Sequence, residues 1–98
     1  MGKFVDSSGD VYEGEWKDGL ASGKGKYTKK DGTEYEGDWM ANLPHGKGVE
    51  KFVNGEVYEG DYEYGNKKGK GTFTSVNDTI YKGDWNNNRI EGFVLYLQ

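Results

Sequence analysis

The sequence has no cysteine, one proline and no long hydrophobic run. Without cysteine, disulfides and thiolate metal sites are excluded. No apolar stretch approaches the length of a membrane span, and we expect no signal peptide because the N-terminus lacks an apolar core. Positive charge is also scarce, since 13 basic residues face 17 acidic ones, for a net charge of −4. This balance argues against nucleic-acid binding, which needs a basic surface, and more weakly against an anionic membrane.

Glycine and aromatic residues are abundant instead. The 98 residues include 17 glycines, and 15% are aromatic although only 33% are hydrophobic. This composition predicts short strands joined by many tight turns, with the apolar surface concentrated in a few large rings. The length predicts a single domain over residues 1–98. Helix is disfavoured, because glycine recurs every few residues and no 3.6-residue apolar period exists.

The chain repeats itself at intervals of 23 residues. The interval relates Tyr12, Tyr35, Tyr58 and Tyr81, the glycines Gly14, Gly37, Gly60 and Gly83, the acids Glu15, Asp38, Asp61 and Asp84, and the rings Trp16, Trp39, Tyr62 and Trp85. A fixed period of this length over four copies indicates a repeat architecture in which each copy is one supersecondary unit.

Each copy is predicted to be a β-hairpin. The first strands are expected at 12–16, 35–39, 58–62 and 81–85, and the return strands from Gly23, Gly46, Gly69 and Gly92. Between them, one turn position holds Gly19, Asn42, Gly65 and Asn88. Only glycine and asparagine adopt the left-handed conformation at low cost, so this position should have a positive φ. A second turn, at Ser8-Gly9, Asp31-Gly32, Asn54-Gly55 and Asn77-Asp78, should join successive hairpins.

Alternation along the strands sorts the side chains onto two faces. Tyr12 and Trp16 share one face with Gly23, Gly25 and Tyr27 of the return strand, if the hairpin is regular. A ring can lie flat over a glycine backbone, so this face should carry the packing. The acids between the rings fall on the other face, near the lysines of the return strand, and should form a solvated ladder.

The strings YEGEW, YEGDW and YEGDY, each followed by a glycine-rich return strand and a turn pair such as Asp-Gly or Asn-Gly, resemble the MORN repeat (membrane occupation and recognition nexus). The resemblance implies an all-β fold, an elongated single antiparallel sheet of tandem hairpins with a grooved face. A partial repeat would cover 1–11, repeats would start at 12, 35 and 58, and a partial last repeat would cover 81–98. Members of this family act as scaffolds or adaptors in ciliary, cytoskeletal and membrane-junction assemblies.

The aromatic stripe is the main candidate for function. It comprises Tyr12, Trp16, Tyr35, Trp39, Tyr58, Tyr62, Tyr81 and Trp85. These rings either pack only on one another and on the glycines, or remain partly accessible and bind a helical or extended segment of another protein. We therefore expect a non-catalytic scaffold or adaptor. The alternative is a peripheral membrane or phosphoinositide binder, for which Lys67, Lys68 and Lys70 form the best basic cluster.

The C-terminal strand departs from the other copies. Its residues Phe93, Val94, Leu95, Tyr96 and Leu97 are apolar on both faces of what should be an edge strand. Soluble proteins normally cover such an edge. It either folds back on the preceding hairpin as a cap or is covered by another chain, including a second copy of this one.

No catalytic or metal site is predicted. His45 is the only histidine and is expected in a loop beside Pro44, without partners for a triad or a metal site. The periodic acids lie on successive hairpins instead of converging in one loop, as calcium would need. No cofactor is implied, and the expected location is cytoplasmic, in association with the cytoskeleton or a cilium.

Overall fold

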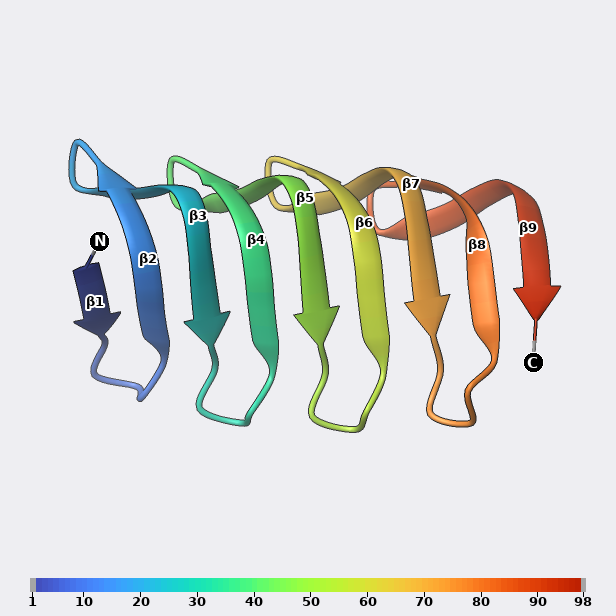
Figure 1. The fold of residues 1–98 in the computed structure, drawn as a ribbon, viewed down its shortest axis with the longest axis horizontal. Helices are drawn as coiled ribbons and strands as arrows, with labels where there is room; N and C mark the ends of the chain where they lie inside the picture. Colours follow the sequence, from blue (N-terminus) through green and yellow to red (C-terminus); the bar gives the residue numbers. More distant parts are fainter. Residues whose placement is uncertain (1, 98) are drawn as a thin grey trace.

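The computed structural model describes the backbone of residues 2–97 and the side chains of residues 2–91, and it contains one nine-stranded antiparallel sheet (Figure 1). The strands are β1 (Gly2–Val5), β2 (Val11–Lys17), β3 (Leu20–Thr28), β4 (Glu34–Met40), β5 (Leu43–Lys51), β6 (Val57–Glu63), β7 (Asn66–Thr74), β8 (Ile80–Asn86) and β9 (Arg89–Leu97). Each strand pairs with its neighbours in chain order. No helix long and apolar enough to cross a membrane occurs among the described residues.

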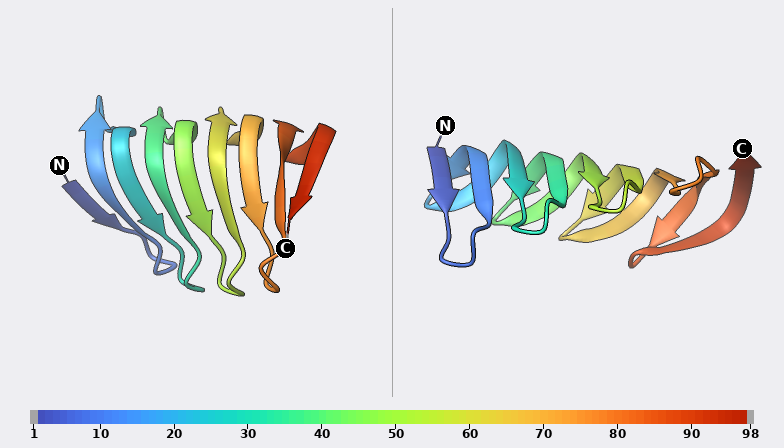
Figure 2. Two further views of the ribbon diagram at one scale, coloured as in Figure 1. Left: turned by 45° about the vertical axis from the view of Figure 1, so that its right-hand side comes forward. Right: turned by 90° about the horizontal axis from the view of Figure 1, so that it is seen from below.

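The predicted all-β hairpin array is confirmed. Each 23-residue copy supplies one first strand and one return strand, and the copies stack along an axis to give dimensions of 40 × 24 × 17 Å (Figure 2). The return strands begin three residues earlier than predicted, at Leu20, Leu43, Asn66 and Arg89. His45 therefore lies inside β5 and not in a loop. The loop prediction was wrong because the hairpin turn takes only two residues.

These two-residue turns have the left-handed geometry that suits a β-hairpin. In the first hairpin Lys17 pairs with Leu20, and the residues between them, Asp18 and Gly19, have φ values of 52° and 78°. The predicted slot is confirmed, with φ between 70° and 88° at Gly19, Asn42, Gly65 and Asn88. Two consecutive positive φ angles define a type I′ turn, whose twist matches that of the flanking strands. The preceding residue shares this geometry in every copy, which the sequence did not reveal at Ala41 or Tyr64.

The choice between asparagine and glycine in the slot follows from the adjacent hairpin. Asn42 donates its N–H to the carbonyl of Ala21 at 3.0 Å, and its side-chain oxygen accepts the N–H of Ala21 at 2.7 Å. Asn88 makes the same two bonds with Lys67. Gly65 also donates to the preceding hairpin, at Pro44, but proline has no N–H for a side chain to accept. Asparagine thus occurs where the neighbouring strand offers a donor.

Replacing Asn42 with glycine should lower the free energy of unfolding by about 1 kcal/mol, the net value of one hydrogen bond. Glycine keeps the positive φ, so only the bond to the Ala21 N–H is lost. Urea denaturation measures the difference. The matched control is Gly65→Asn, which should change stability by less than about 0.5 kcal/mol, because Pro44 offers no donor. A larger gain from Gly65→Asn would contradict this explanation.

A bulge in each hairpin bends the sheet. In the first hairpin Gly14 pairs with Gly25 and Trp16 with Ala21, so that one residue of β2 faces three of β3. Gly23 lies in this bulge with a φ of 91°. The hairpin is therefore not regular, as the prediction had required, and a Cβ atom added at Gly23 would meet the Glu15 side chain, although Gly23 still pairs with Trp39 of β4. A bulge increases the local bend and twist of a strand, and the strands curve over near the two-residue turns (Figure 1).

The core forms where tyrosines lie over glycines. A Cβ atom added at Gly25 would overlap the Tyr12 ring, and Gly48 and Gly71 have the same relation to Tyr35 and Tyr58. The Tyr12 hydroxyl donates to the carbonyl of the bulge residue Glu15 at 2.8 Å. The repeated tyrosine therefore fills the space above glycine and satisfies the carbonyl that the bulge leaves outside the ladder.

Candidate functional site

The rings of the aromatic stripe pack edge to face in one continuous row. The row runs Trp16, Tyr12, Trp39, Tyr35, Tyr62, Tyr58 and Trp85, with centroid distances of 5.0–5.3 Å and interplanar angles of 81–89°. Tyr81 stands outside it and contacts Phe73 at 6.3 Å. Edge-to-face pairs contribute about 0.5–1.5 kcal/mol each beyond the area they bury. The row thus joins the neighbouring repeats into one core.

Most of the row is buried, but its edge forms the wall of a groove. Tyr58 is fully buried, whereas Trp16 keeps 38% of its surface exposed. The groove has a volume of about 780 Å³. It is lined by five stripe residues, Tyr12, Trp16, Tyr35, Trp39 and Tyr62, together with Phe4, Ala21, Tyr27, Lys29, Pro44, Glu50, Lys67 and the turn residues Gly19, Asn42, Gly65 and Asn88. Of the stripe, Tyr58, Tyr81 and Trp85 do not line this groove.

Hydrogen bonds fix the rings that line the groove. The indole N–H of Trp39 donates to the Gly25 carbonyl at 3.0 Å. The Tyr27 hydroxyl donates to the Asp10 carboxylate at 2.6 Å, and this bond raises the pKa of Tyr27 to about 12. Burial raises the pKa of Tyr35 as well, so the phenols of the groove stay protonated at neutral pH. The groove is therefore a rigid surface of neutral rings.

One end of the groove carries a charged pair. Glu50 of β5 accepts a hydrogen bond from the Tyr62 hydroxyl at 2.9 Å, and the Lys67 ammonium lies 3.3 Å from the same oxygen. Burial, followed by the charge of Glu50, raises the pKa of Tyr62. The sequence pattern placed Lys67 in a basic cluster and gave no indication that it pairs with Glu50. Aligning Lys67 with its equivalents Ala21, Pro44 and Ile90 is the signal that would have singled it out.

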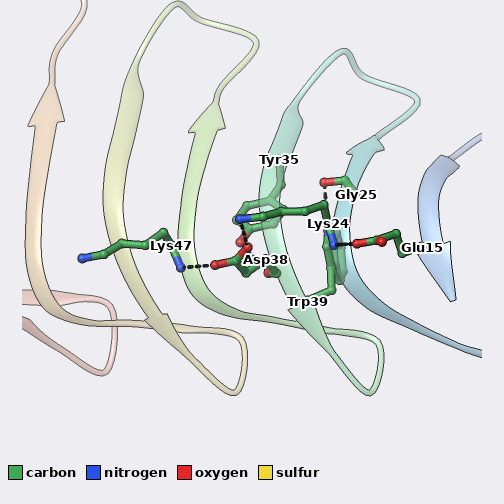
Figure 3. Close-up of polar contacts among 7 residues, drawn as sticks. All are labelled: Glu15, Lys24, Gly25, Tyr35, Asp38, Trp39 and Lys47. Atoms are coloured by element: carbon green, nitrogen blue, oxygen red, sulfur yellow. Dashed lines mark hydrogen bonds and ion pairs between the residues drawn. The ribbon is translucent and has the colours of Figure 1, made fainter. Parts of the chain in front are cut away.

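A ladder of acids and lysines links neighbouring repeats (Figure 3), and its residues Glu15, Lys24, Asp38 and Lys47 do not line the groove. The Glu15 carboxylate accepts the Lys24 backbone N–H at 2.6 Å, and the Lys24 ammonium pairs with Asp38 of the next copy. Asp38 in turn accepts the Lys47 N–H at 3.1 Å. The Lys24 hydrogen bond lowers the pKa of Asp38. The lysines of this ladder are about three-quarters exposed, so its ion pairs add little stability, as predicted for a solvated face.

The three lysines of the predicted basic cluster are each paired with a carboxylate. Lys67 pairs with Glu50, Lys68 with Glu63 at 3.1 Å, and Lys70 with Asp84 at 2.5 Å. The cluster therefore presents much less net positive charge than its sequence suggests.

The predicted terminal edge is confirmed at the level of the backbone. β9 is the last strand in the sheet order and pairs with β8, with Ile80 opposite Leu97. The side chains of Phe93, Val94, Leu95, Tyr96 and Leu97 lie outside the described residues, so the cap and the intermolecular alternatives both stay predictions. At the other end of the sheet, Phe4 and Val5 of β1 are 54% and 58% exposed.

His45 makes a structural contact. Its Nδ1 accepts the backbone N–H of Tyr64 at 3.1 Å, and its ring lies 4.6 Å from that of Tyr64. This contact supports a turn residue with a positive φ. Among the side chains of residues 2–91, no group of three or more histidine, aspartate or glutamate residues is arranged to hold a metal ion.

Comparisons with known proteins agree with this geometry. The family model for the MORN repeat matches residues 12–34, 35–57, 58–80 and 81–93. These boundaries coincide with the 23-residue copies, each of which begins at the repeated tyrosine, and in the first three copies this tyrosine packs over a glycine. No curated protein matches the chain.

Proposed function

This chain belongs to the MORN repeat family, whose non-enzymatic repeats generally serve as modules for protein or membrane interaction, and on that premise we propose that it is a non-catalytic adaptor that holds a segment of another protein in its aromatic groove. The observation that carries the proposal is the groove itself. Its rings are fixed by packing and hydrogen bonds before any ligand arrives, so binding costs little ordering of the protein. A helical or an extended segment with apolar anchors fits such a surface.

Trp16 is the groove residue best suited to contact a partner. Its ring combines a large apolar area with 38% exposure, and it contacts Tyr12 at the open end of the aromatic row. Partly exposed tryptophans in preformed depressions commonly dominate binding energy. The buried tyrosines of the row, in contrast, hold the sheet together, and replacing them would unfold the site.

Peptides selected from a random display library against this chain should lose about ten-fold in affinity when Trp16 is replaced by alanine. Val53→Ala is the matched control, because Val53 is 66% exposed but lies outside the groove. Fluorescence anisotropy gives the affinities, and circular dichroism verifies that both variants are folded. Equal affinities for the two variants would exclude the groove. Shifts of amide resonances confined to β1 or β9 would move the site to an edge of the sheet.

The membrane alternative has less support. Each lysine of the proposed basic cluster faces a carboxylate, and the chain carries a net charge of −4. The attraction of such a surface to an anionic membrane is weak and is screened by salt. Selective binding to phosphoinositide vesicles that persists at physiological salt, and disappears when Lys68 and Lys70 are neutralised, would favour that alternative.

Two further predictions follow from the family resemblance and the topology. Association with another chain, or with a second copy, through the outer edge of β9 is physically reasonable because an edge strand can pair with a new strand. A cytoplasmic location in a cytoskeletal or ciliary assembly is implied by the resemblance and stays a prediction.

A further inference from the structure

Three apolar positions of the repeat are polar in the middle of the chain. Tyr62 replaces the tryptophan of Trp16, Trp39 and Trp85, Lys67 replaces Ala21, Pro44 and Ile90, and Glu50 replaces the aromatic residue of Tyr27 and Phe73. The three replacements contact one another, although they come from β5, β6 and β7. The other repeats show that apolar side chains fill this space well. A half-buried ion pair seldom stabilises more than such packing, so stability does not explain the trio.

The trio holds one carboxylate in a fixed position. The Tyr62 hydroxyl and the Lys67 ammonium both contact Oε1 of Glu50, at 2.9 and 3.3 Å. The ammonium also lies 5.1 Å from the ring centroid of Tyr58 and 5.7 Å from those of Phe52 and Tyr62. Lys67 is therefore satisfied by a carboxylate and three aromatic faces.

The second oxygen of Glu50 is available to a ligand. No described side chain donates a hydrogen bond to Oε2, and it is not among the buried polar atoms without a partner. The Glu50 side chain is 18% exposed and lines the groove. A carboxylate has acceptor sites on both oxygens, so a donor in the groove can bind Oε2 without disturbing Tyr62 or Lys67.

We infer that Glu50 selects the charge of the bound segment, accepting a hydrogen bond from a lysine or arginine side chain whose apolar neighbours lie against Trp16 and Trp39. This inference rests on the proposed function of the groove. Charge complementarity supports it, because the chain as a whole is acidic and Oε2 is an open acceptor. An acidic ligand would have to displace Lys67 from its contacts with Glu50 and three rings. It would then lie beside Glu50, which carries the same charge. The other cation of the groove, Lys29, is exposed and screened.

Two small probes with the same ring and opposite charge test the inference: tryptamine, which carries an ammonium group, and indole-3-propionate, which carries a carboxylate. Each is titrated into the ¹⁵N-labelled chain, and the indole N–H signals of Trp16 and Trp39 report on the groove. Tryptamine should bind about five-fold more tightly than indole-3-propionate, the ratio that one partly exposed charge pair supplies. Glu50→Gln should remove the preference. Glu63→Gln is the matched control, because that carboxylate pairs with Lys68 outside the groove and its loss should leave the preference intact.

Lys67→Ala tests whether Glu50 or Lys67 determines the charge preference of the groove. Alanine is the residue at the equivalent position 21. If Glu50 determines the preference, removing the Lys67 ammonium that pairs with it should tighten tryptamine binding by a few-fold. Weaker binding of indole-3-propionate, with tryptamine unchanged, would assign the role to Lys67 and overturn the inference. Equal binding of both probes to the unmodified chain would also overturn it, while leaving the groove as a binding site. If neither probe shifts the groove signals, the proposed function fails as well.

Discussion

Gly48→Ala should lower the free energy of unfolding by about 3 kcal/mol, the upper part of the range for an overpacked core. Gly48 is buried between Gly37 and Gly60 on the adjacent strands, and an added methyl group would overlap the hydroxyl and ring of Tyr35. Tyr35 cannot move away freely, because it is 5% exposed and its hydroxyl donates to the Asp38 carbonyl at 2.9 Å. Urea unfolding followed by tryptophan fluorescence measures the loss.

The control for this prediction is Gly55→Ala. Gly55 lies in a turn with a φ of 98°, and a Cβ atom there would have no neighbour within 4 Å. Its replacement should cost about 1 kcal/mol from backbone strain alone. Equal losses for the two variants would show that the ring does not depend on the bare glycine, and the account of the core would then be wrong.

Tyr58→Ala should cost about 4 kcal/mol, as expected when a buried aromatic side chain leaves a cavity. Tyr58 has no exposed surface, and its ring joins Tyr62 at 5.3 Å to Trp85 at 5.1 Å. Its removal therefore cuts the aromatic row between the third and fourth repeats. Since small domains are stable by only about 5–15 kcal/mol, the variant should be close to unfolding at room temperature. Thermal denaturation measures the change.

Two tyrosine variants test whether the loss of stability in Tyr58→Ala comes from the buried ring. Tyr58→Phe removes only the hydroxyl, which donates to the Asp61 carbonyl at 3.0 Å, and should cost about 1 kcal/mol. Tyr64→Ala removes a ring that is 58% exposed and should cost less than about 1 kcal/mol. A similar loss for Tyr64→Ala and Tyr58→Ala would mean that the row does not carry the stability of the sheet.

The candidate site was only partly predictable from the sequence. The stripe was found because its members recur every 23 residues, and five of the eight line the groove. Which members line the groove could not be predicted, because alternation gives the face of a side chain but not the curvature of the sheet that shapes the groove. The Glu50, Tyr62 and Lys67 trio was missed for a related reason. Tyr62 and Lys67 are 12 and 17 residues from Glu50 in the chain, and only the strand pairing and the bend of the sheet bring the three side chains together.

The sequence by itself determined the period, the antiparallel hairpins and the positive φ at Gly19, Asn42, Gly65 and Asn88. These features depend on local chemistry, because strand alternation and the conformational freedom of glycine and asparagine act within a few residues. Tertiary structure alone decided the bulge at Gly23, the curvature of the sheet, and the bond that makes asparagine useful at position 42 and redundant at position 65. Each of these depends on what the adjacent strand offers: an extra residue, a ring to cover, or an N–H that alanine has and proline lacks.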